Sequence, residues 1–169
     1  MTDKNNNKMK TINKEQEKKT IQLPAFISIE SALGAVSMLA MKSNNHKYLF
    51  VSDYEWLIMP PIALKQFVLF RTEKNEPIAF ISWASVNEEV EKRLLNGKNK
   101  LKPQEWNSGN KLYIIDMITP YGIGKEILKQ LNEKQFKDKD VYLIRPKKDE
   151  KGIEGKLLKE LIEEFKDKK

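Results

Sequence analysis

Two hydrophobic periods alternate along this chain, and their alternation limits the possible folds more than any other feature. Residues 28–42 carry apolar side chains at spacings of three and four, which predicts an amphipathic helix with Ser28 as its N-cap or Ser31 as an alternative start. Residues 66–72 and 77–84 are β-rich runs separated by the polar turn 73–76, which predicts an antiparallel hairpin. Helical and strand periods in one chain indicate a layered fold.

The second half continues the alternation. A surface helix is expected over 86–97 and a strongly apolar strand over 111–120, followed by a helix that two glycines open at 121–131. A further strand is expected at 140–146 and an amphipathic helix at 153–165. This order, without an internal repeat, predicts an α/β fold: a single domain in which helices flank a mixed β-sheet.

The ends of the chain differ from its middle. Residues 1–20 are polar, rich in Lys and Asn and without periodicity, which predicts a disordered basic tail ahead of a folded domain at 21–169. No run of 18 apolar residues occurs, and the N-terminus has no apolar stretch that could serve as a signal peptide. We therefore expect a cytoplasmic protein without a membrane span.

Cysteine is absent and histidine occurs once, as His46. These counts exclude a disulfide, a thiolate nucleophile, cysteine-ligated zinc and any multi-histidine metal site within one chain, so no metal is expected. If the chemistry needs a base near neutral pH, the candidates are His46 or a carboxylate or lysine with a shifted pKa.

The formal net charge of +7 is concentrated at the two ends of the chain. Residues 1–20 carry six lysines against three acids, 21–120 carry eleven cations against ten acids, and 121–169 carry fourteen against eleven. Only three of the 31 cations are arginines, which suits bidentate reading of phosphates or bases poorly. We expect an acidic macromolecular partner and no nucleic acid.

One carboxylate, Asp116, interrupts the strand predicted at 111–120. A buried carboxylate is costly unless something pairs with it, so Asp116 either points outward or has a partner. As a partner it could orient a histidine, fix its tautomer and leave the other ring nitrogen to accept a proton. His46, in the polar stretch 43–48, is the only histidine for that role; otherwise it is a solvated loop residue.

A second candidate site follows the same strand. Gly122 and Gly124 precede a predicted helix, where glycines let backbone N–H groups approach a phosphate, and Lys125 adds positive charge. Two glycines at a strand-to-helix turn also occur in ordinary turns, so the pattern alone leaves both interpretations open.

Several short motifs together resemble one protein family. They are SWA at 82–84, W-x-S-G at 106–109, I-D-M-I-x-P-Y-G at 115–122 and the block LGAVSMLAMKSNNH at 33–46. This combination closely resembles the RTX-toxin-activating lysine acyltransferases, the proteins that activate hemolysin-type protoxins.

The resemblance implies an acyltransferase fold of the GNAT-like kind and a homodimer. It also implies an activity in which a fatty acyl group passes from acyl-acyl carrier protein, a 4'-phosphopantetheine thioester co-substrate, to internal lysine ε-amines of an RTX protoxin. No bound cofactor is implied, and the partners would be the acyl carrier protein and the protoxin.

The resemblance also assigns residues. His46 and Asp116 fall on the family's catalytic histidine and aspartate, and Ser43 falls on a supporting serine. The loop of Gly122, Gly124 and Lys125 lies where the wider superfamily binds the pantetheine phosphate.

The chain departs from the family pattern at Leu57, where an asparagine is typical, and after Arg145, where the family's Phe-His-Gly-Gly-like segment is missing. Two alternative functions therefore stay open. One is a GNAT-like acyl-CoA N-acyltransferase acting on another amine, and the other is an inactive basic binding module.

Overall fold

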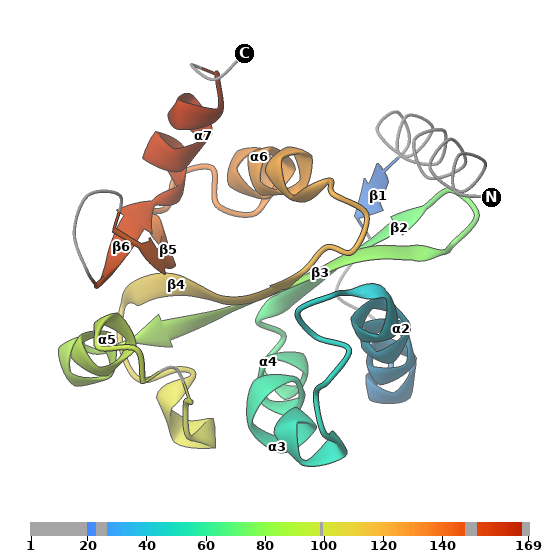
Figure 1. Ribbon diagram of the computed structural model, residues 1–169, viewed down its shortest axis with the longest axis horizontal. Coiled ribbons are helices and arrows are strands. Elements are labelled where there is room, and N and C mark those ends of the chain that lie inside the picture. Colours follow the sequence, from blue (N-terminus) through green and yellow to red (C-terminus); the bar gives the residue numbers. More distant parts are fainter. Residues whose placement is uncertain (1–19, 23–26, 99, 148–151, 167–169) are drawn as a thin grey trace.

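Six strands form one sheet whose spatial order follows their order in the chain (Figure 1). The computed structural model describes residues 20–22, 27–98, 100–147 and 152–166. Within these ranges the strands are β1 (Thr20–Gln22), β2 (Phe67–Thr72), β3 (Pro77–Val86), β4 (Lys111–Ile118), β5 (Val141–Pro146) and β6 (Ile153–Leu157).

The sheet is mixed. β4 and β5 pair in parallel, and every other neighbouring pair is antiparallel. The predicted hairpin is confirmed as β2 and β3, although β3 continues two residues beyond the predicted end. The parallel pair needs a crossover, which the helix α6 (Gly124–Lys134) supplies. This is the α/β architecture with a mixed sheet expected from the sequence pattern, and it is consistent with the GNAT-like fold that the resemblance implies.

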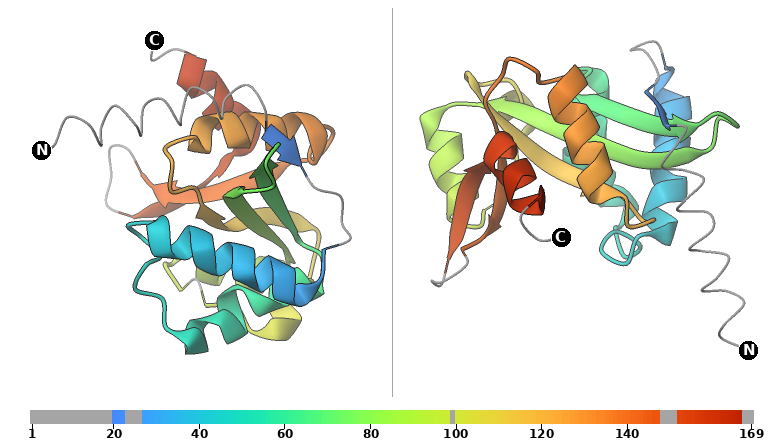
Figure 2. Two further views of the ribbon diagram at one scale, coloured as in Figure 1. Left: turned by 90° about the vertical axis from the view of Figure 1, so that its right-hand side faces the viewer. Right: turned by 90° about the horizontal axis from the view of Figure 1, so that it is seen from above.

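Helices cover both faces of the sheet (Figures 1 and 2). One face carries α2 (Ile29–Lys42), α3 (Tyr54–Leu57) and α4 (Met59–Ala63), with α5 (Glu88–Leu95) toward the end of the same face. The other carries α6 and α7 (Leu158–Lys166). Two short 3-10 turns, η1 (Val51–Asp53) and η2 (Pro103–Glu105), lie in the connections.

Helix α2 forms as the sequence predicts. The Ser28 hydroxyl caps its N-terminus by accepting a hydrogen bond from the backbone N–H of Ser31 at 3.2 Å. Its buried residues recur with helical spacing and pack on the sheet beside α3 and α4: Ala32, Ala35, Val36, Leu39 and Ala40. The end of α2 is therefore held firmly above the sheet, and that position matters for the site.

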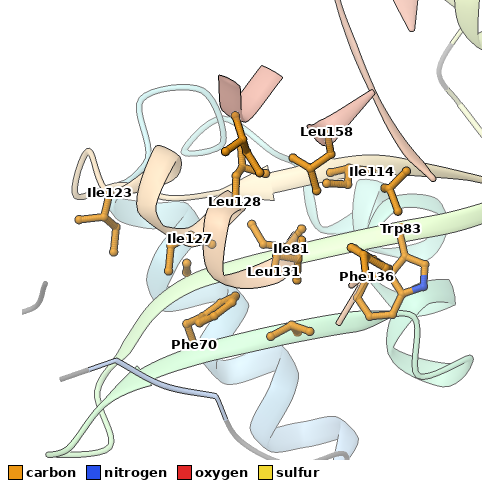
Figure 3. Packing of buried hydrophobic residues seen from close by; sticks show 14 of the residues in the cluster. Phe70, Ile81, Trp83, Ile114, Ile123, Ile127, Leu128, Leu131, Phe136 and Leu158 are labelled. Atoms are coloured by element: carbon orange, nitrogen blue, oxygen red, sulfur yellow. The ribbon is translucent and has the colours of Figure 1, made fainter. Parts of the chain in front are cut away.

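The opposite face holds the largest apolar cluster (Figure 3). There the apolar side of α6, including Ile127 and Leu131, packs on β3 and β4, and Leu158 from α7 joins it. The ring of Trp83 meets Phe136 edge to face, with 5.1 Å between their centroids. Packing on both faces fixes the position of the two central strands.

A β-bulge interrupts β4 at Ile115. Ser82 of β3 pairs with Asp116 and the next residue, Trp83, pairs with Ile114, which leaves Ile115 as an extra residue. In a regular strand, residues 114 and 116 would share one face. Here Ile114 packs under α6, whereas Asp116, on the register of Ser82, faces the side of α2 with Ile118. The bulge therefore turns Asp116 to the other face.

The prediction of a helix over 153–165 is wrong for its first part. Residues 153–157 form β6, paired antiparallel with β5, and α7 begins only at Leu158. Gly155 explains the difference, because glycine is a poor helix former and a Cβ at this position would lie 2.9 Å from the Tyr113 hydroxyl oxygen. The strand can thus pass close to the Tyr113 ring.

Two further parts of the chain differ from the expectation. Helices α3 and α4 lie in residues 51–64, for which the sequence pattern predicts no element. The tail predicted at 1–20 lies outside the described residues except for Thr20, the first residue of β1. In the part of the chain that the structure describes, no helix is both long enough and apolar enough to cross a membrane.

Candidate active site

His46 sits in a tight turn that follows the end of α2. Ser43 is the C-cap of that helix, and its carbonyl oxygen accepts hydrogen bonds from the backbone N–H groups of His46 at 3.2 Å and Lys47 at 3.0 Å. The His46 carbonyl in turn accepts from the N–H of Leu49 at 3.0 Å. The polar stretch 43–48 therefore forms a turn, which holds the imidazole at the C-terminal end of α2.

The imidazole reaches across to the central sheet. The Nε2 atom of His46 lies 2.9 Å from Oδ1 of Asp116, and both side chains are largely buried, with exposed fractions of 13% and 14%. The same carboxylate oxygen accepts a hydrogen bond from the backbone N–H of Met117 at 2.9 Å. Of the two interpretations of Asp116 in the sequence, the structure supports the one in which it has a histidine partner.

The second ring nitrogen is also engaged. The Oγ atom of Ser43 lies 2.7 Å from Nδ1 of His46, and Ser43 is buried. A carboxylate can only accept, so a neutral His46 carries its proton on Nε2 and donates it to Asp116. Nδ1 then accepts the hydroxyl proton of Ser43, which gives a chain of three groups ordered Ser43, His46, Asp116.

Two buried oxygen atoms, one in Asp116 itself and one in the residue opposite it, have no hydrogen-bond partner among the described residues. They are Oδ2 of Asp116 and Oγ of Ser82, which stands opposite Asp116 in the β3–β4 register. Ser82 is fully buried on the same strand face as Phe80 and Ala84. The sequence reasoning did not single it out, although a serine in an otherwise apolar run is the signal that could have done so.

The glycine loop directly follows β4, the strand that carries Asp116. Gly122 has a positive φ of 75°, which favours glycine, and α6 begins at Gly124 without a side-chain cap, so its first N–H groups can bind an anion. Lys125 lies over the ring of Phe165, 5.2 Å from its centroid. Tyr121 links the loop to α2, since its hydroxyl accepts a hydrogen bond from Lys42 Nζ at 3.0 Å.

The pairing between β4 and β5 covers only the start of β4. It runs from Leu112 opposite Val141 to Ile114 opposite Leu143, and no pairing beyond it is present among the described residues. The end of β4, which carries Asp116, therefore has one edge that β5 does not cover. Backbone N–H and C=O groups along that edge can bind an extended ligand.

Leu57, the departure from the family pattern, is a core residue here. It is buried in the cluster under α2 with Ile58 and Ile62. An apolar side chain cannot donate or accept a hydrogen bond, so this position supplies no polar contact to the site.

A model of the RTX toxin acyltransferase family matches residues 27–157, which covers α2, the His46 turn, β4 and the glycine loop. The chain belongs to the RTX toxin acyltransferase family. The match includes His46 and Asp116, so the two residues that meet in the structure both lie within the family region.

Similar proteins within the RTX toxin acyltransferase family are named for lysine acylation. The chain is 35% identical over 108 residues to the lysine-acyltransferase RtxC of Vibrio cholerae, covering 64% of this chain and 71% of that protein. It is 34% identical over 122 residues to the leukotoxin-activating lysine-acyltransferase LktC serotype A1 of Mannheimia haemolytica, covering 71% and 72%. It is 35% identical over 113 residues to the protein-lysine myristoyltransferase HlyC of Escherichia coli, covering 67% and 64%.

Proposed function

We propose that this protein transfers a fatty acyl group from acyl-acyl carrier protein to internal lysine ε-amines of an RTX protoxin. The arrangement of Ser43, His46 and Asp116 within the matched family region is the observation that carries the proposal. We assign the transfer to the domain at 21–169, and the cytoplasmic location and homodimer expected from the resemblance belong to the same proposal.

The acceptor amine must lose a proton before it attacks. A lysine ε-amine has an ordinary pKa of about 10.4, so at neutral pH it is mostly a cation and not a nucleophile. His46 can accept that proton on Nδ1, either directly after the Ser43 hydroxyl turns aside or through that hydroxyl as a relay. Asp116 stabilises the imidazolium that results, because the Nε2–H points at its carboxylate.

Acyl transfer forms one carbon–nitrogen bond and breaks one carbon–sulfur bond. The neutral amine nitrogen bonds to the acyl carbon of the thioester, and the carbon–sulfur bond breaks. The imidazolium gives the first proton to the pantetheine thiolate, which leaves as the thiol. The neutral imidazole then accepts the second proton that the nitrogen loses on forming the amide, and releases it to solvent. We propose that backbone N–H groups at the uncovered edge of β4 or at the start of α6 stabilise the carbonyl oxygen.

General-base catalysis fits the contacts better than an acyl-histidine intermediate does. A nucleophilic nitrogen needs an available lone pair that faces the carbonyl carbon. In this structure Nδ1 is held by Ser43 and Nε2 by Asp116, so proton transfer through the Ser43 hydroxyl needs no rearrangement, whereas attack by Nδ1 needs that hydroxyl to turn aside. With no cysteine in the chain, an enzyme thioester is excluded as well.

The anion-binding features are consistent with a phosphopantetheine arm. We propose that Gly122, Gly124 and the uncapped start of α6 receive its phosphate and that Lys125 contributes charge. Lys125 would leave its position over Phe165 to do so, a change that a flexible four-carbon side chain permits.

Co-expression of the full chain with an RTX protoxin tests the proposal. Mass spectrometry of the toxin should detect acyl-lysine with the wild type and a large loss with His46→Ala and with Asp116→Asn. A purified assay with acyl-acyl carrier protein and acyl-CoA in parallel identifies the donor. Absence of acyl-lysine with the wild type, or undiminished acylation with both variants, would contradict the proposal. Preference for acyl-CoA would favour the alternative GNAT-like enzyme.

A further inference from the structure

Large apolar side chains are exposed in the sequence segments before and after His46. Among the described residues seven large hydrophobic side chains are exposed, and five of them fall within residues 38–51, with exposed fractions from 48% to 88%. These five define what we call the flanking surface: Met38, Met41, Tyr48, Phe50 and Val51. Such a concentration of exposed apolar groups is typical of a protein interaction site.

The members of the flanking surface come from two neighbouring segments. Met38 and Met41 are three residues apart on α2 and so lie on one side of that helix. The segment that carries the other three returns alongside α2, because the hydroxyl of Tyr54 hydrogen-bonds with the hydroxyl of Ser37 at 3.1 Å. His46 lies between the two segments in the chain, and its imidazole points inward to Asp116.

The charged side chains between Met38 and Ser52 are all positive, and the carboxylate of the next acid, Asp53, accepts hydrogen bonds from the Phe50 N–H and the Trp56 indole. Residues 38–52 contain two lysines, Lys42 and Lys47, and no acid. Both lysines are exposed, and both lie over tyrosine rings, Lys42 at 5.5 Å from the Tyr121 centroid and Lys47 at 5.1 Å from that of Tyr48. A partner that fits this surface therefore combines apolar side chains with acidic ones.

The position of Lys42 connects the flanking surface to the candidate phosphate loop. Its Nζ donates to the hydroxyl of Tyr121, the residue before Gly122. A partner seated on the flanking surface would thus stand next to the loop proposed to hold a phosphate. A carrier that delivers its acyl group on a phosphopantetheine arm needs this arrangement.

We infer that the flanking surface is the docking site of the acyl carrier protein, an inference that rests on the proposed function. Acyl carrier proteins are acidic, and they present apolar side chains beside the phosphopantetheine attachment point. Phe50 and Met41 supply the apolar anchors, and Lys47 supplies the charge that an acidic helix meets. The protoxin then approaches His46 from another side.

The test measures binding of labelled holo acyl carrier protein to the full chain by fluorescence anisotropy. Phe50→Ser, Met41→Ser and Lys47→Glu should each raise the dissociation constant, by roughly tenfold or more for Phe50, as for an interface hot spot. Matched controls are Ile29→Ser and Leu64→Ser, at the two other large hydrophobic residues that are exposed in the described part of the chain, and affinity should not change there. Salt should weaken the wild type more than it weakens Lys47→Glu.

The same variants also test three other possible occupants of the flanking surface: the acceptor peptide, a second copy of the chain and an anionic membrane. The KM of acceptor peptide, self-association by sedimentation velocity and binding to anionic lipid vesicles are measured alongside. Unchanged carrier affinity with a raised peptide KM, a lost dimer or lost vesicle binding would each overturn the docking assignment. If the wild type transfers acyl groups from the carrier while all three variants bind it normally, the docking site alone fails. If the wild type does not use the carrier at all, the proposed function fails.

Discussion

Ser82 lies directly opposite Asp116 in the sheet, and each of these residues buries an oxygen atom without a hydrogen-bond partner in the described structure. Opposed side chains in antiparallel strands have Cβ atoms about 5 Å apart, so the two side chains are neighbours in the sheet. A buried hydroxyl that makes no hydrogen bond lowers stability.

We therefore expect Ser82→Ala to leave the free energy of unfolding unchanged or to raise it by up to about 1 kcal/mol. Urea denaturation of the free protein measures the change. Ser85→Ala, on the same strand three residues away, serves as a control for loss of a hydroxyl. A loss of more than 1 kcal/mol in Ser82→Ala alone would mean that the hydroxyl is satisfied in the folded protein.

Asp116→Asn should lower kcat for acyl transfer by roughly 10²- to 10⁴-fold, the range for loss of acid–base assistance. The amide cannot stabilise an imidazolium as a carboxylate does, although its size is nearly the same. His46→Ala should lie in the same range, and the double variant should be no worse than the single variants because the two groups act as a unit. Independent, multiplicative losses in the double variant would argue against a coupled pair.

Substitution of Ser43 distinguishes proton transfer through its hydroxyl from direct proton transfer to His46. If its hydroxyl passes the proton to Nδ1, Ser43→Ala should lower kcat by about tenfold or more, and Ser43→Thr should restore part of the loss. If the amine contacts Nδ1 directly, Ser43→Ala should change kcat little. The profile of kcat against pH, measured for all three proteins, shows whether the essential base has changed.

The stability of the protein should fall at acid pH partly through Glu105. Hydrogen bonds from Arg93, at 2.8 and 2.7 Å, lower the pKa of Glu105 to about 2 despite its burial. A carboxylate with a lowered folded-state pKa stabilises above its unfolded value and loses that contribution as pH falls from about 4.5 to about 2. Glu105→Gln should cost about 1–3 kcal/mol at pH 7 and almost nothing at pH 2, as measured by chemical denaturation.

Gly155 offers a test of packing with a control of opposite sign. A methyl group there would lie 2.9 Å from the Tyr113 hydroxyl oxygen, which donates to Glu91 at 2.7 Å, so Gly155→Ala should cost about 1–3 kcal/mol. Gly34, within α2, has nothing within 4 Å of its would-be Cβ, so Gly34→Ala should stabilise by about 0.5–1 kcal/mol. Equal effects in thermal unfolding would contradict the packing.

Local signals in the sequence predicted the elements that depend on local chemistry. The Ser28 cap, the β2–β3 hairpin and the helix that opens at Gly124 follow from side chains within a few residues of each boundary. The strand β6 was mistaken for a helix because its alternation is short and its pairing with β5 is a tertiary event. Helix α4 was missed because Pro60 and Pro61 lie at its start, where proline is tolerated but disguises the pattern.

The candidate site was predictable in part. The residue types that meet were named from the sequence, since a lone histidine and a carboxylate in an apolar strand are both unusual. Their meeting across 70 positions was not derivable, because it requires α2 to dock on the sheet and Asp116 to face α2. The orientation of Asp116 toward α2 depends on the bulge at Ile115, which no local sequence pattern predicts.

That bulge makes the site depend on a count of residues rather than on their kinds. One residue added or removed between Tyr113 and Asp116 would move the carboxylate to the opposite face of the sheet, although the strand would stay equally apolar. A design that grafts the histidine–aspartate pair onto another sheet must therefore include the β-bulge as well. A smooth strand with the same residues would present its acid to α6 and leave the imidazole without a counter-charge.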